Sequence, residues 1–282
     1  MGDGGVETVA APAVLEVRNV VKRYASRRQG LGSRAADVVA VDDVSFDLRP
    51  GETLALVGES GCGKTTTASI AARLETPDTG TVRFRGEDVF AMGRARAKRF
   101  RRELQVVFQD PYASLNPRMT VGAIVSEGWR IHGDVVPARE RAARVGDLLA
   151  LVGLRPETAD RYPHQFSGGQ RQRIGIARAL SLSPEVIVCD EPVSALDVSV
   201  QAQIINLLGR LQAEFGLAYL FISHDLGVVR HLADRVAVMH RGVLVEVGDK
   251  RQVYELPQHE YTRRLLAAAP RLDRRRPPRT AG

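Results

Sequence analysis

Residues 58–66, with the sequence GESGCGKTT, place glycines, a lysine and threonines where a phosphate-binding loop needs them. The stretch matches the pattern G-x-x-x-x-G-K-[ST] at every fixed position. Glycines let backbone N–H groups curl around phosphate oxygens, and the N-terminus of a following helix adds positive charge. We expect Lys64 to reach the β- and γ-phosphates of a nucleotide, and Thr65 to ligate Mg²⁺. The expected nucleotide contacts of this loop are Gly58, Glu59, Ser60, Gly61, Cys62, Gly63, Lys64, Thr65 and Thr66.

Two adjacent carboxylates end the apolar run VIVCDE at residues 186–191. Phosphoryl transfer needs a carboxylate for the metal and a group that orients the attacking water. Asp190 suits the first role and Glu191 suits the second. His224, which ends the run AYLFISH, is a candidate contact for the γ-phosphate. The structural alternatives are that Asp-Glu-Pro only caps a strand and that His224 only packs at a strand end.

A second glycine-containing segment lies in the stretch HQFSGGQRQR. Ser167 and Gln170 have the spacing of a capping box at the head of a helix, which is a purely structural role. A capping box does not need Gly168 or Gly169, and each glycine costs up to about 1 kcal/mol relative to alanine in a helix. We therefore expect these glycines to let the backbone approach an anion that lies outside this helix.

The elements that must position these residues follow from the pattern of apolar side chains. The runs at residues 53–58, 186–191 and 218–224 are short and continuously apolar, which is typical of strands buried on both faces. Helical patterns follow each run, at residues 64–74, 200–215 and 226–233, and another spans 167–182. Buried strands that alternate with helices predict an α/β fold with a mainly parallel sheet.

The remaining segments predict a side sheet and an inserted group of helices. Residues 14–24 and 39–48 alternate in polarity like antiparallel strands, and TVRFRGEDV reads as another strand with a turn. The stretch RVAVMHRGVLVEVG predicts a hairpin that turns near Arg241 and Gly242. Residues 94–155 look helical, with Pro and Gly breaks, so we expect an inserted subdomain between Gly93 and Arg161. A last helix is expected over 261–269.

Composition indicates a globular chain that works in a reducing compartment. The chain has 282 residues, of which 44% are hydrophobic and 26% are charged. It has no apolar run near the eighteen or so residues that a membrane span needs, and its N-terminus lacks the pattern of a secretory signal. Two cysteines, Cys62 and Cys189, are too few for a disulfide framework or a structural zinc site.

The net charge of +7 is concentrated in two places. The alternatives are a solvated basic surface and an anionic partner such as a nucleotide, nucleic acid or lipid headgroups. One cluster comprises Arg94, Arg96, Lys98, Arg99, Arg101 and Arg102, and the other comprises Arg271, Arg274, Arg275, Arg276 and Arg279.

Taken together, these residues resemble an ATP-binding-cassette (ABC) ATPase over residues 14–269. The phosphate loop is similar to Walker A, residues 186–190 to Walker B, and FSGGQ to the family's LSGGQ signature, with Phe166 in place of leucine. The resemblance implies ATP and Mg²⁺ as cofactors, and it implies catalytic roles for Glu191, His224 and Lys64. It implies metal contacts for Thr65, Gln109 and Asp190. Further nucleotide contacts implied are Tyr24, Gln109, Ser167, Gly168, Gly169, Gln170 and Asp197, the last ending a D-loop-like SALD.

The fold implied is a P-loop NTPase (RecA-like) core with an N-terminal antiparallel β-subdomain and an inserted α-helical subdomain at about residues 110–175. The implied domains are a flexible N-terminus (1–13), an ATPase domain (14–255) and a C-terminal extension with a basic tail (256–282). In the family, two cassettes sandwich two nucleotides, and each site pairs one chain's Walker motifs with the other chain's signature.

Longer stretches, among them VVFQDPYASLNPRMTVG and HEYTRRLLAAAP, look like the second ATPase subunit of oligopeptide and dipeptide importers. Nickel and glutathione importers belong to the same subfamily. The resemblance implies a peripheral position on the cytoplasmic face of the cell membrane. The implied partners are a related second ATPase subunit, two permease subunits and, indirectly, an extracytoplasmic solute-binding protein. Some members of this subfamily carry a cysteine cluster near the C-terminus. No cysteine follows Cys189 in this chain, so we expect no iron–sulfur cluster.

A nucleic-acid-associated function is an alternative on the residues alone, whereas a P-loop kinase does not fit them. A nucleic-acid-associated ABC ATPase would suit the basic charge, although the chain has one cassette and neither a coiled-coil nor a zinc insertion. We therefore expect no nucleic-acid partner. A P-loop kinase would give no role to the segment from Ser167 to Gln170.

Overall fold

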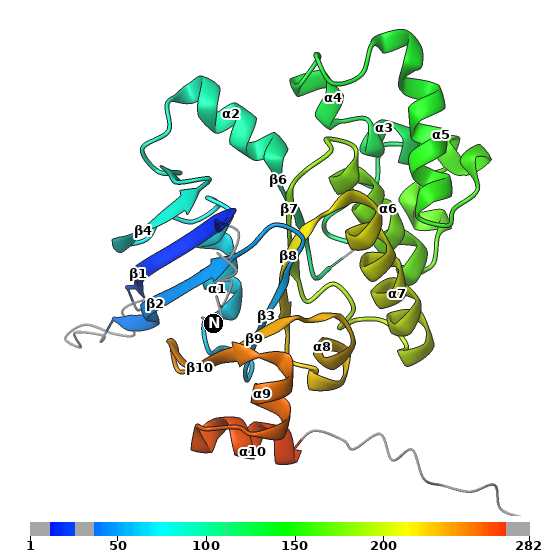
Figure 1. The fold of residues 1–282 in the computed structure, drawn as a ribbon. Coiled ribbons are helices and arrows are strands. Elements are labelled where there is room, and N and C mark those ends of the chain that lie inside the picture. Colours follow the sequence, from blue (N-terminus) through cyan, green and yellow to red (C-terminus); the bar gives the residue numbers. More distant parts are fainter. Residues whose placement is uncertain (1–11, 26–36, 111, 269–282) are drawn as a thin grey trace, which may run out of the picture.

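The computed structural model describes residues 12–25, 37–110 and 112–268. Two sheets and a group of helices make up this part of the chain (Figure 1). The predicted N-terminal segment lies mostly outside the described residues, and the predicted basic tail lies entirely outside them.

A six-stranded sheet with the order β10-β9-β3-β8-β7-β6 forms the centre of the molecule. Its strands are β3 (Thr53–Val57), β6 (Leu104–Val107), β7 (Val186–Asp190), β8 (Ala218–Ser223), β9 (Arg235–His240) and β10 (Val243–Asp249). All neighbours are parallel except β9 and β10, which form the predicted hairpin. Arg241 and Gly242 both have positive φ, 49° and 88°, as the turn of a tight hairpin requires. The predicted α/β fold with a mainly parallel sheet is confirmed.

Alternate residues of the central strands face two different apolar cores, which explains why their sequences are continuously apolar. In β3, Leu54 and Leu56 pack on the side of the antiparallel strands. Ala55 and Val57 pack on the side of the helices. Because neither face meets water, no polar alternation is left in the sequence.

The first core lies between the central sheet and a four-stranded antiparallel sheet with the order β2-β1-β4-β5. Its strands are β1 (Leu15–Tyr24), β2 (Val38–Leu48), β4 (Thr79–Phe84) and β5 (Glu87–Asp88). Helix α1 (Lys64–Ala71) contacts β1 and β2 of this sheet and β7 and β8 of the central sheet. The side sheet predicted from the N-terminal alternation is therefore present.

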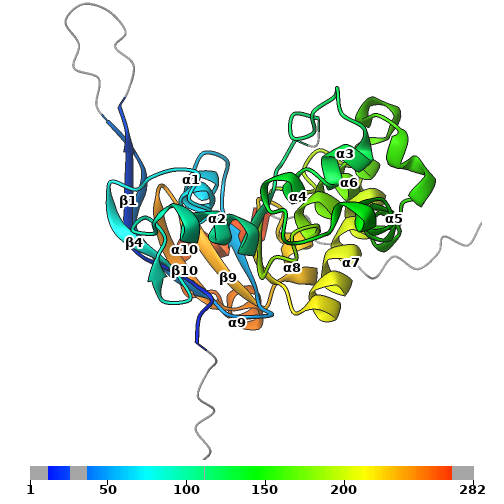
Figure 2. The same cartoon turned by 90° about the horizontal axis from the view of Figure 1, so that it is seen from above.

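The second core lies under a group of helices on the other side of the molecule. Figure 2 shows α3 to α8 there, away from β1 and β4. The elements are α3 (Val121–Val125), α4 (Gly128–Ile131), α5 (Arg141–Leu151), α6 (Gly168–Leu180), α7 (Val198–Phe215) and α8 (Leu226–Leu232), with short 3₁₀ turns at Ala138–Glu140, Pro156–Asp160 and Pro163–Gln165. The buried Trp129 donates its Nε1–H to the Ser181 carbonyl across 2.8 Å, so its polar atom is satisfied.

The helical character predicted for residues 94–155 is wrong for residues 104–107, which form a strand. Helix α2 (Arg94–Glu103) packs on the antiparallel sheet, where Phe100 meets Phe84 edge-to-face. The next four residues form β6, the edge strand of the central sheet. Four residues are too few for periodicity to separate a strand from a buried turn of helix.

After β10 the chain continues into α9 (Lys250–Glu255) and α10 (Glu260–Ala268). These helices lie beside β9 and β10, at the opposite side of the molecule from α3 to α6 (Figure 2). Among the described residues, none of the helices has the length and apolarity that crossing a membrane would take.

Candidate functional site

The phosphate loop joins β3 to α1, as the sequence predicts. Three of its glycines have positive φ: 154° at Gly58, 77° at Gly61 and 109° at Gly63. A Cβ at Gly58 would collide with the Met239 carbonyl oxygen, and one at Gly63 would collide with the Ala40 carbonyl oxygen. Glycine is therefore required at both positions for conformation and for space.

Lys64 is the first residue of α1 and is only 4% exposed. Its ammonium group donates to the carbonyl oxygens of Gly58 and Glu59, each at 2.8 Å. An ammonium group has three N–H donors. The two carbonyls therefore orient the charge, and the third donor meets only the Cys62 sulfur, a weak acceptor, at 3.8 Å.

Thr65 and Asp190 come together where α1 begins and β7 ends. The Thr65 hydroxyl donates to Asp190 Oδ1 across 3.2 Å. Burial raises the pKa of Asp190, and the Glu191 carboxylate adds to this, while Thr65 and Lys64 act in the opposite direction. A cation beside Asp190 would relieve this penalty on the ionised form.

The donor set fits Mg²⁺ only if phosphate oxygens complete it. A hydroxyl and one carboxylate are the oxygen ligands that Mg²⁺ takes in nucleotide sites. In the part of the chain that the structure describes, no group of three or more His, Cys, Asp or Glu side chains could hold a metal ion. Thr65 and Asp190 would therefore hold Mg²⁺ together with a bound nucleotide.

Glu191 lies at the centre of a three-residue cluster. Its Oε2 accepts from Gln109 Nε2 at 3.2 Å and lies 3.1 Å from His224 Nδ1. These residues follow β6, β7 and β8, which are neighbours in the parallel sheet, so the carboxyl ends of the strands bring them together. Glu191 has a φ of 45°, a conformation that costs free energy for a residue with a side chain.

The other residues predicted for the nucleotide site lie at its edges. Glu59 and Ser60 are exposed, and Thr66 is half-buried. Burial raises the pKa of the Cys62 thiol. Tyr24 ends β1 and is 40% exposed, with the Lys22 ammonium 5.4 Å from the centre of its ring. Asp197 precedes α7 and makes no side-chain cap there. Their contacts with a nucleotide stay predictions.

The capping box predicted at the head of α6 is confirmed. Ser167 Oγ accepts from the Gln170 N–H at 3.3 Å, and Gln170 Oε1 accepts from the Ser167 N–H at 3.0 Å. Ser167 and Gln170 are exposed. This helix N-terminus therefore presents a hydroxyl and backbone amides to the surroundings.

The explanation predicted for Gly169 was incomplete. Gly169 is buried, and a Cβ there would collide with Cγ1 of Val200 on α7. Close packing of α6 on α7 therefore requires this glycine, whatever approaches the helix from outside. Gly168 is half-buried, and a Cβ there would lie 3.2 Å from Leu196. The role of Gly168 toward an external anion stays a prediction.

The two glycine loops belong to different parts of one chain. Within the described ranges, no hydrogen bond or ion pair joins residues 58–66 to residues 167–170. Figure 2 places α1 in the half with the antiparallel sheet and α6 in the half with the helices. The two glycine-containing segments are therefore separate features of this chain, and neither one holds the other in place.

Sequence reasoning missed two residues that touch the phosphate loop from the C-terminal part of the chain. The Glu59 N–H donates to the Tyr261 hydroxyl at 3.2 Å, and the Gly242 N–H donates to the Cys62 carbonyl at 2.9 Å. The stretch HEYTRRLL around Tyr261 was a signal for family resemblance, but spacing alone could not bring it to residue 59.

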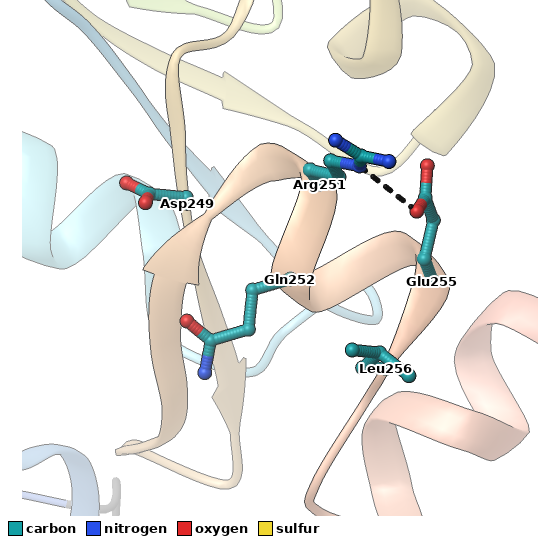
Figure 3. A pocket seen from close by; sticks show the side chains of 5 residues that line it. All are labelled: Asp249, Arg251, Gln252, Glu255 and Leu256. Carbon is teal, nitrogen blue, oxygen red and sulfur yellow. Dashed lines mark hydrogen bonds and ion pairs between the residues drawn. The ribbon is translucent and has the colours of Figure 1, made fainter.

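A hollow on α9 is lined by residues that lie apart from the predicted nucleotide site in the sequence. Figure 3 shows its lining, and Arg251 there pairs with Glu255 across 3.1 Å. The full lining is Asp249, Arg251, Gln252, Glu255 and Leu256. None of these residues belongs to the predicted site.

Comparisons with known proteins agree with this geometry. The sequence pattern of a family described as ABC transporter matches residues 41–194. The chain is 56% identical over 257 residues to the glutathione import ATP-binding protein GsiA of Escherichia coli, covering 91% of this chain and 41% of GsiA. It therefore spans about two fifths of the length of that relative.

A second relative is similar over more of its own length. The chain is 54% identical over 259 residues to the oligopeptide transport ATP-binding protein AppF of Bacillus subtilis, covering 91% of this chain and 78% of AppF. A solved structure, the dimeric post-hydrolysis state of the ATP-binding cassette MJ0796 bound to ADP and Pi, matches with a TM-score of 0.70 at 27% identity. That match covers 84% of this chain and 99% of the other.

Proposed function

This chain belongs to the ABC transporter family, and we propose that it is the ATP-binding and ATP-hydrolysing subunit of an importer for oligopeptides, dipeptides or a related small solute. The observation that carries the proposal is the cluster of Gln109, Glu191 and His224 beside the pair of Thr65 and Asp190. The names of GsiA and AppF, import of glutathione and transport of oligopeptides, support the solute class. Nickel is a further candidate within the subfamily that the sequence resembles.

Lys64, Thr65 and Asp190 bind and orient the nucleotide in this proposal. The Lys64 N–H that meets only the weak Cys62 sulfur acceptor turns to a phosphate oxygen, and the loop amides curl around the rest. Thr65 and Asp190 hold Mg²⁺, which supplies charge neutralisation on the phosphates when it is bound. Tyr24, at the end of β1, stacks on the adenine.

Glu191 orients the attacking water. Both of the groups that touch its carboxylate, Gln109 Nε2 and His224 Nδ1, lie at Oε2. The second oxygen, Oε1, is then available to accept a hydrogen bond from water. Gln109 and His224 hold the carboxylate in place, because each comes from a neighbouring strand of one rigid sheet.

The segment from Ser167 to Gln170 serves a nucleotide bound to a second cassette. The separation of α6 from the phosphate loop within one chain supports this arrangement, since the segment needs an anion from elsewhere. A dimeric relative bound to ADP and Pi also supports it. Asp197, in the SALD segment just before α7, contributes to the same interface.

The working assembly comprises this chain and a related second ATPase subunit at the cytoplasmic face of the cell membrane, bound to two permease chains that span the membrane. The domain limits inferred from the sequence, an ATPase domain at 14–255 and an extension at 256–282, are part of this proposal. A solute-binding protein acts through the permease and does not need to touch this chain.

Affinity purification of the complex from membranes, followed by mass spectrometry and reconstitution in vesicles, tests the proposal. We expect permease chains and a second ATPase subunit to co-purify, and ATP hydrolysis to rise when solute-loaded binding protein is added. Stimulation of ATP hydrolysis by DNA, with no permease recovered, would contradict the transport function.

A further inference from the structure

The segment after β10 touches the phosphate loop through one tyrosine. Tyr261 lies near the start of α10, and its hydroxyl accepts the hydrogen bond from the Glu59 N–H at 3.2 Å. Burial raises the pKa of the Tyr261 hydroxyl, so the group is neutral at physiological pH. Neither the phosphate contacts nor the catalytic cluster gives this residue a role.

Tyr261 is held in place from two sides. The Glu246 carboxylate, on β10, accepts from the N–H groups of Gln258 and His259 at 2.9 and 3.0 Å, which anchors the turn before α10. The Tyr261 ring lies against the His240 ring at the end of β9, with 3.9 Å between ring centres. The hydroxyl is therefore presented to the loop by a fixed ring.

The hydroxyl lies behind the loop, on the side opposite Lys64. It accepts from the N–H of the peptide that joins Gly58 to Glu59, and the carbonyl of the same peptide accepts from Lys64 at 2.8 Å. In a trans peptide the C=O and N–H point in opposite directions, and the described residues contain no cis peptide. Tyr261 thus leaves the side of the loop that faces Lys64 free.

The orientation of this peptide needs an external constraint. Gly58 has no side chain and a φ of 154°, so local sterics restrict it little. If the peptide turned over, its carbonyl would point away from Lys64. The ammonium group would then lose one of the two carbonyls that orient it.

We propose that Tyr261 is a positioning residue for ATP binding, whose hydroxyl holds the Gly58–Glu59 peptide with its carbonyl toward Lys64. The inference rests on the proposed ATP-binding function and extends it to α10. Tyr261 touches no reacting atom, so its loss affects nucleotide binding and leaves the chemical step unchanged. The segment around Tyr261 thereby becomes part of the nucleotide site.

The test is Tyr261→Phe, which keeps the ring on His240 and removes only the hydroxyl. Tyr254→Phe is the matched control, because the Tyr254 hydroxyl on α9 donates to the Leu226 carbonyl and not to the loop. Titration of the full chain with ATP gives the dissociation constant, and the assembled complex gives kcat and KM. Amide hydrogen exchange of Glu59 is measured without nucleotide.

We expect Tyr261→Phe to raise both Kd and KM for ATP by about threefold to tenfold, the scale of one hydrogen bond, with kcat unchanged. Exchange of the Glu59 amide should be faster in Tyr261→Phe than in the wild type or in Tyr254→Phe. The wild-type affinity and the wild-type Glu59 exchange rate in Tyr261→Phe would overturn the inference, and so would a fall in kcat at unchanged KM. If the wild type itself failed to bind ATP, the proposed function would fall, and the Glu59 exchange rate would still decide whether Tyr261 holds this peptide.

Discussion

The side-chain amide of Gln109 donates to the Glu191 carboxylate across 3.2 Å, and it does so between the ends of two neighbouring strands. Gln109 follows β6, and the chain after it continues into helices α3 to α6. In the proposed mechanism, a change at Glu191, such as the arrival of water or phosphate, would act directly on Gln109, just after the point where the chain leaves the sheet. This connection would give the proposed nucleotide site a physical route to the helical part of the chain.

Glu191→Gln should retain ATP binding and lose turnover. The amide keeps the size of the side chain but cannot act as a base toward water, so hydrolysis should fall by about 10²- to 10⁴-fold. Phosphate release by the reconstituted complex measures turnover, and ATP titration measures binding. Turnover at the wild-type rate would remove Glu191 from the catalytic role.

Ser167→Arg should impair turnover at the proposed site shared by two cassettes and leave ATP binding by this chain's own phosphate loop unchanged. The exposed hydroxyl lies away from this chain's phosphate loop, so ATP affinity of the isolated chain should stay unchanged. Turnover of the assembled complex should fall by about 10²-fold, as when a donor to a transition state is removed. Ala150→Arg, on the exposed side of α5, is the control for added charge. Equal loss of binding and turnover in Ser167→Arg would argue against the sandwich.

The effect of Gly169→Ala on the free energy of unfolding should change sign when Val200 is shortened to alanine. In the wild-type background the new Cβ meets Val200, and overpacking should lower the free energy of unfolding by about 1–3 kcal/mol. In a Val200→Ala background the same change should be neutral or stabilising, because alanine favours a helix over glycine by about 1 kcal/mol. Denaturant unfolding of the four proteins measures the cycle.

The ATPase activity of the double variant Gly169→Ala/Val200→Ala shows whether Gly169 has a role besides packing against α7. If internal packing alone requires this glycine, the stable double variant should hydrolyse ATP at the wild-type rate in the assembled complex. A stable but inactive double variant would show that Gly169 is also needed for close approach of a phosphate.

Glu246 should make stability depend on pH. Burial opposes ionisation of this carboxyl, but the Gln258 N–H, the nearby Thr262 hydroxyl and the His259 N–H together outweigh it, so its pKa is lowered in the folded chain. A lowered pKa stabilises the fold above the unfolded-state pKa, and this contribution is lost as the pH falls through the folded-state pKa. Glu246→Gln should cost about 1–3 kcal/mol at pH 7, because one backbone N–H loses its acceptor.

Unfolding measured between pH 3 and pH 7 tests this expectation, with Glu255→Gln as the exposed control. The difference between Glu246→Gln and the wild type should shrink as the pH falls. A difference that stays constant over the whole range would show that the carboxylate charge is not the source of the stabilisation.

The parts of the fold that were predictable from sequence are those where burial leaves a repeated pattern. The strands that became β3, β7 and β8 were readable because both of their faces are covered. The hairpin at Arg241 and the capping box at Ser167 were readable because short-range chemistry fixes them. Glu191 and His224 were predictable because each directly follows such a strand, and Lys64 was predictable from the spacing of the phosphate-loop motif.

The rest depends on contacts between residues that no local pattern connects. Strand β6 has four residues, and its place at the sheet edge comes from pairing with β7. The need for a glycine at position 169 comes from Val200, and the role inferred for Tyr261 comes from Glu59. These relationships are set by how the elements pack, and a single sequence does not display them.

The position of β3 has a consequence for how the molecule forms during synthesis. This strand lies between β8 and β9, so Leu54 pairs with Leu220 on one side and with Arg235 on the other. Both partners leave the ribosome long after β3 does, and pairing between such distant segments is slow. The strand that carries the phosphate loop must therefore wait with both edges unpaired while most of the chain is made. Until those partners are made, its apolar side chains are open to a chaperone that covers apolar strands during translation.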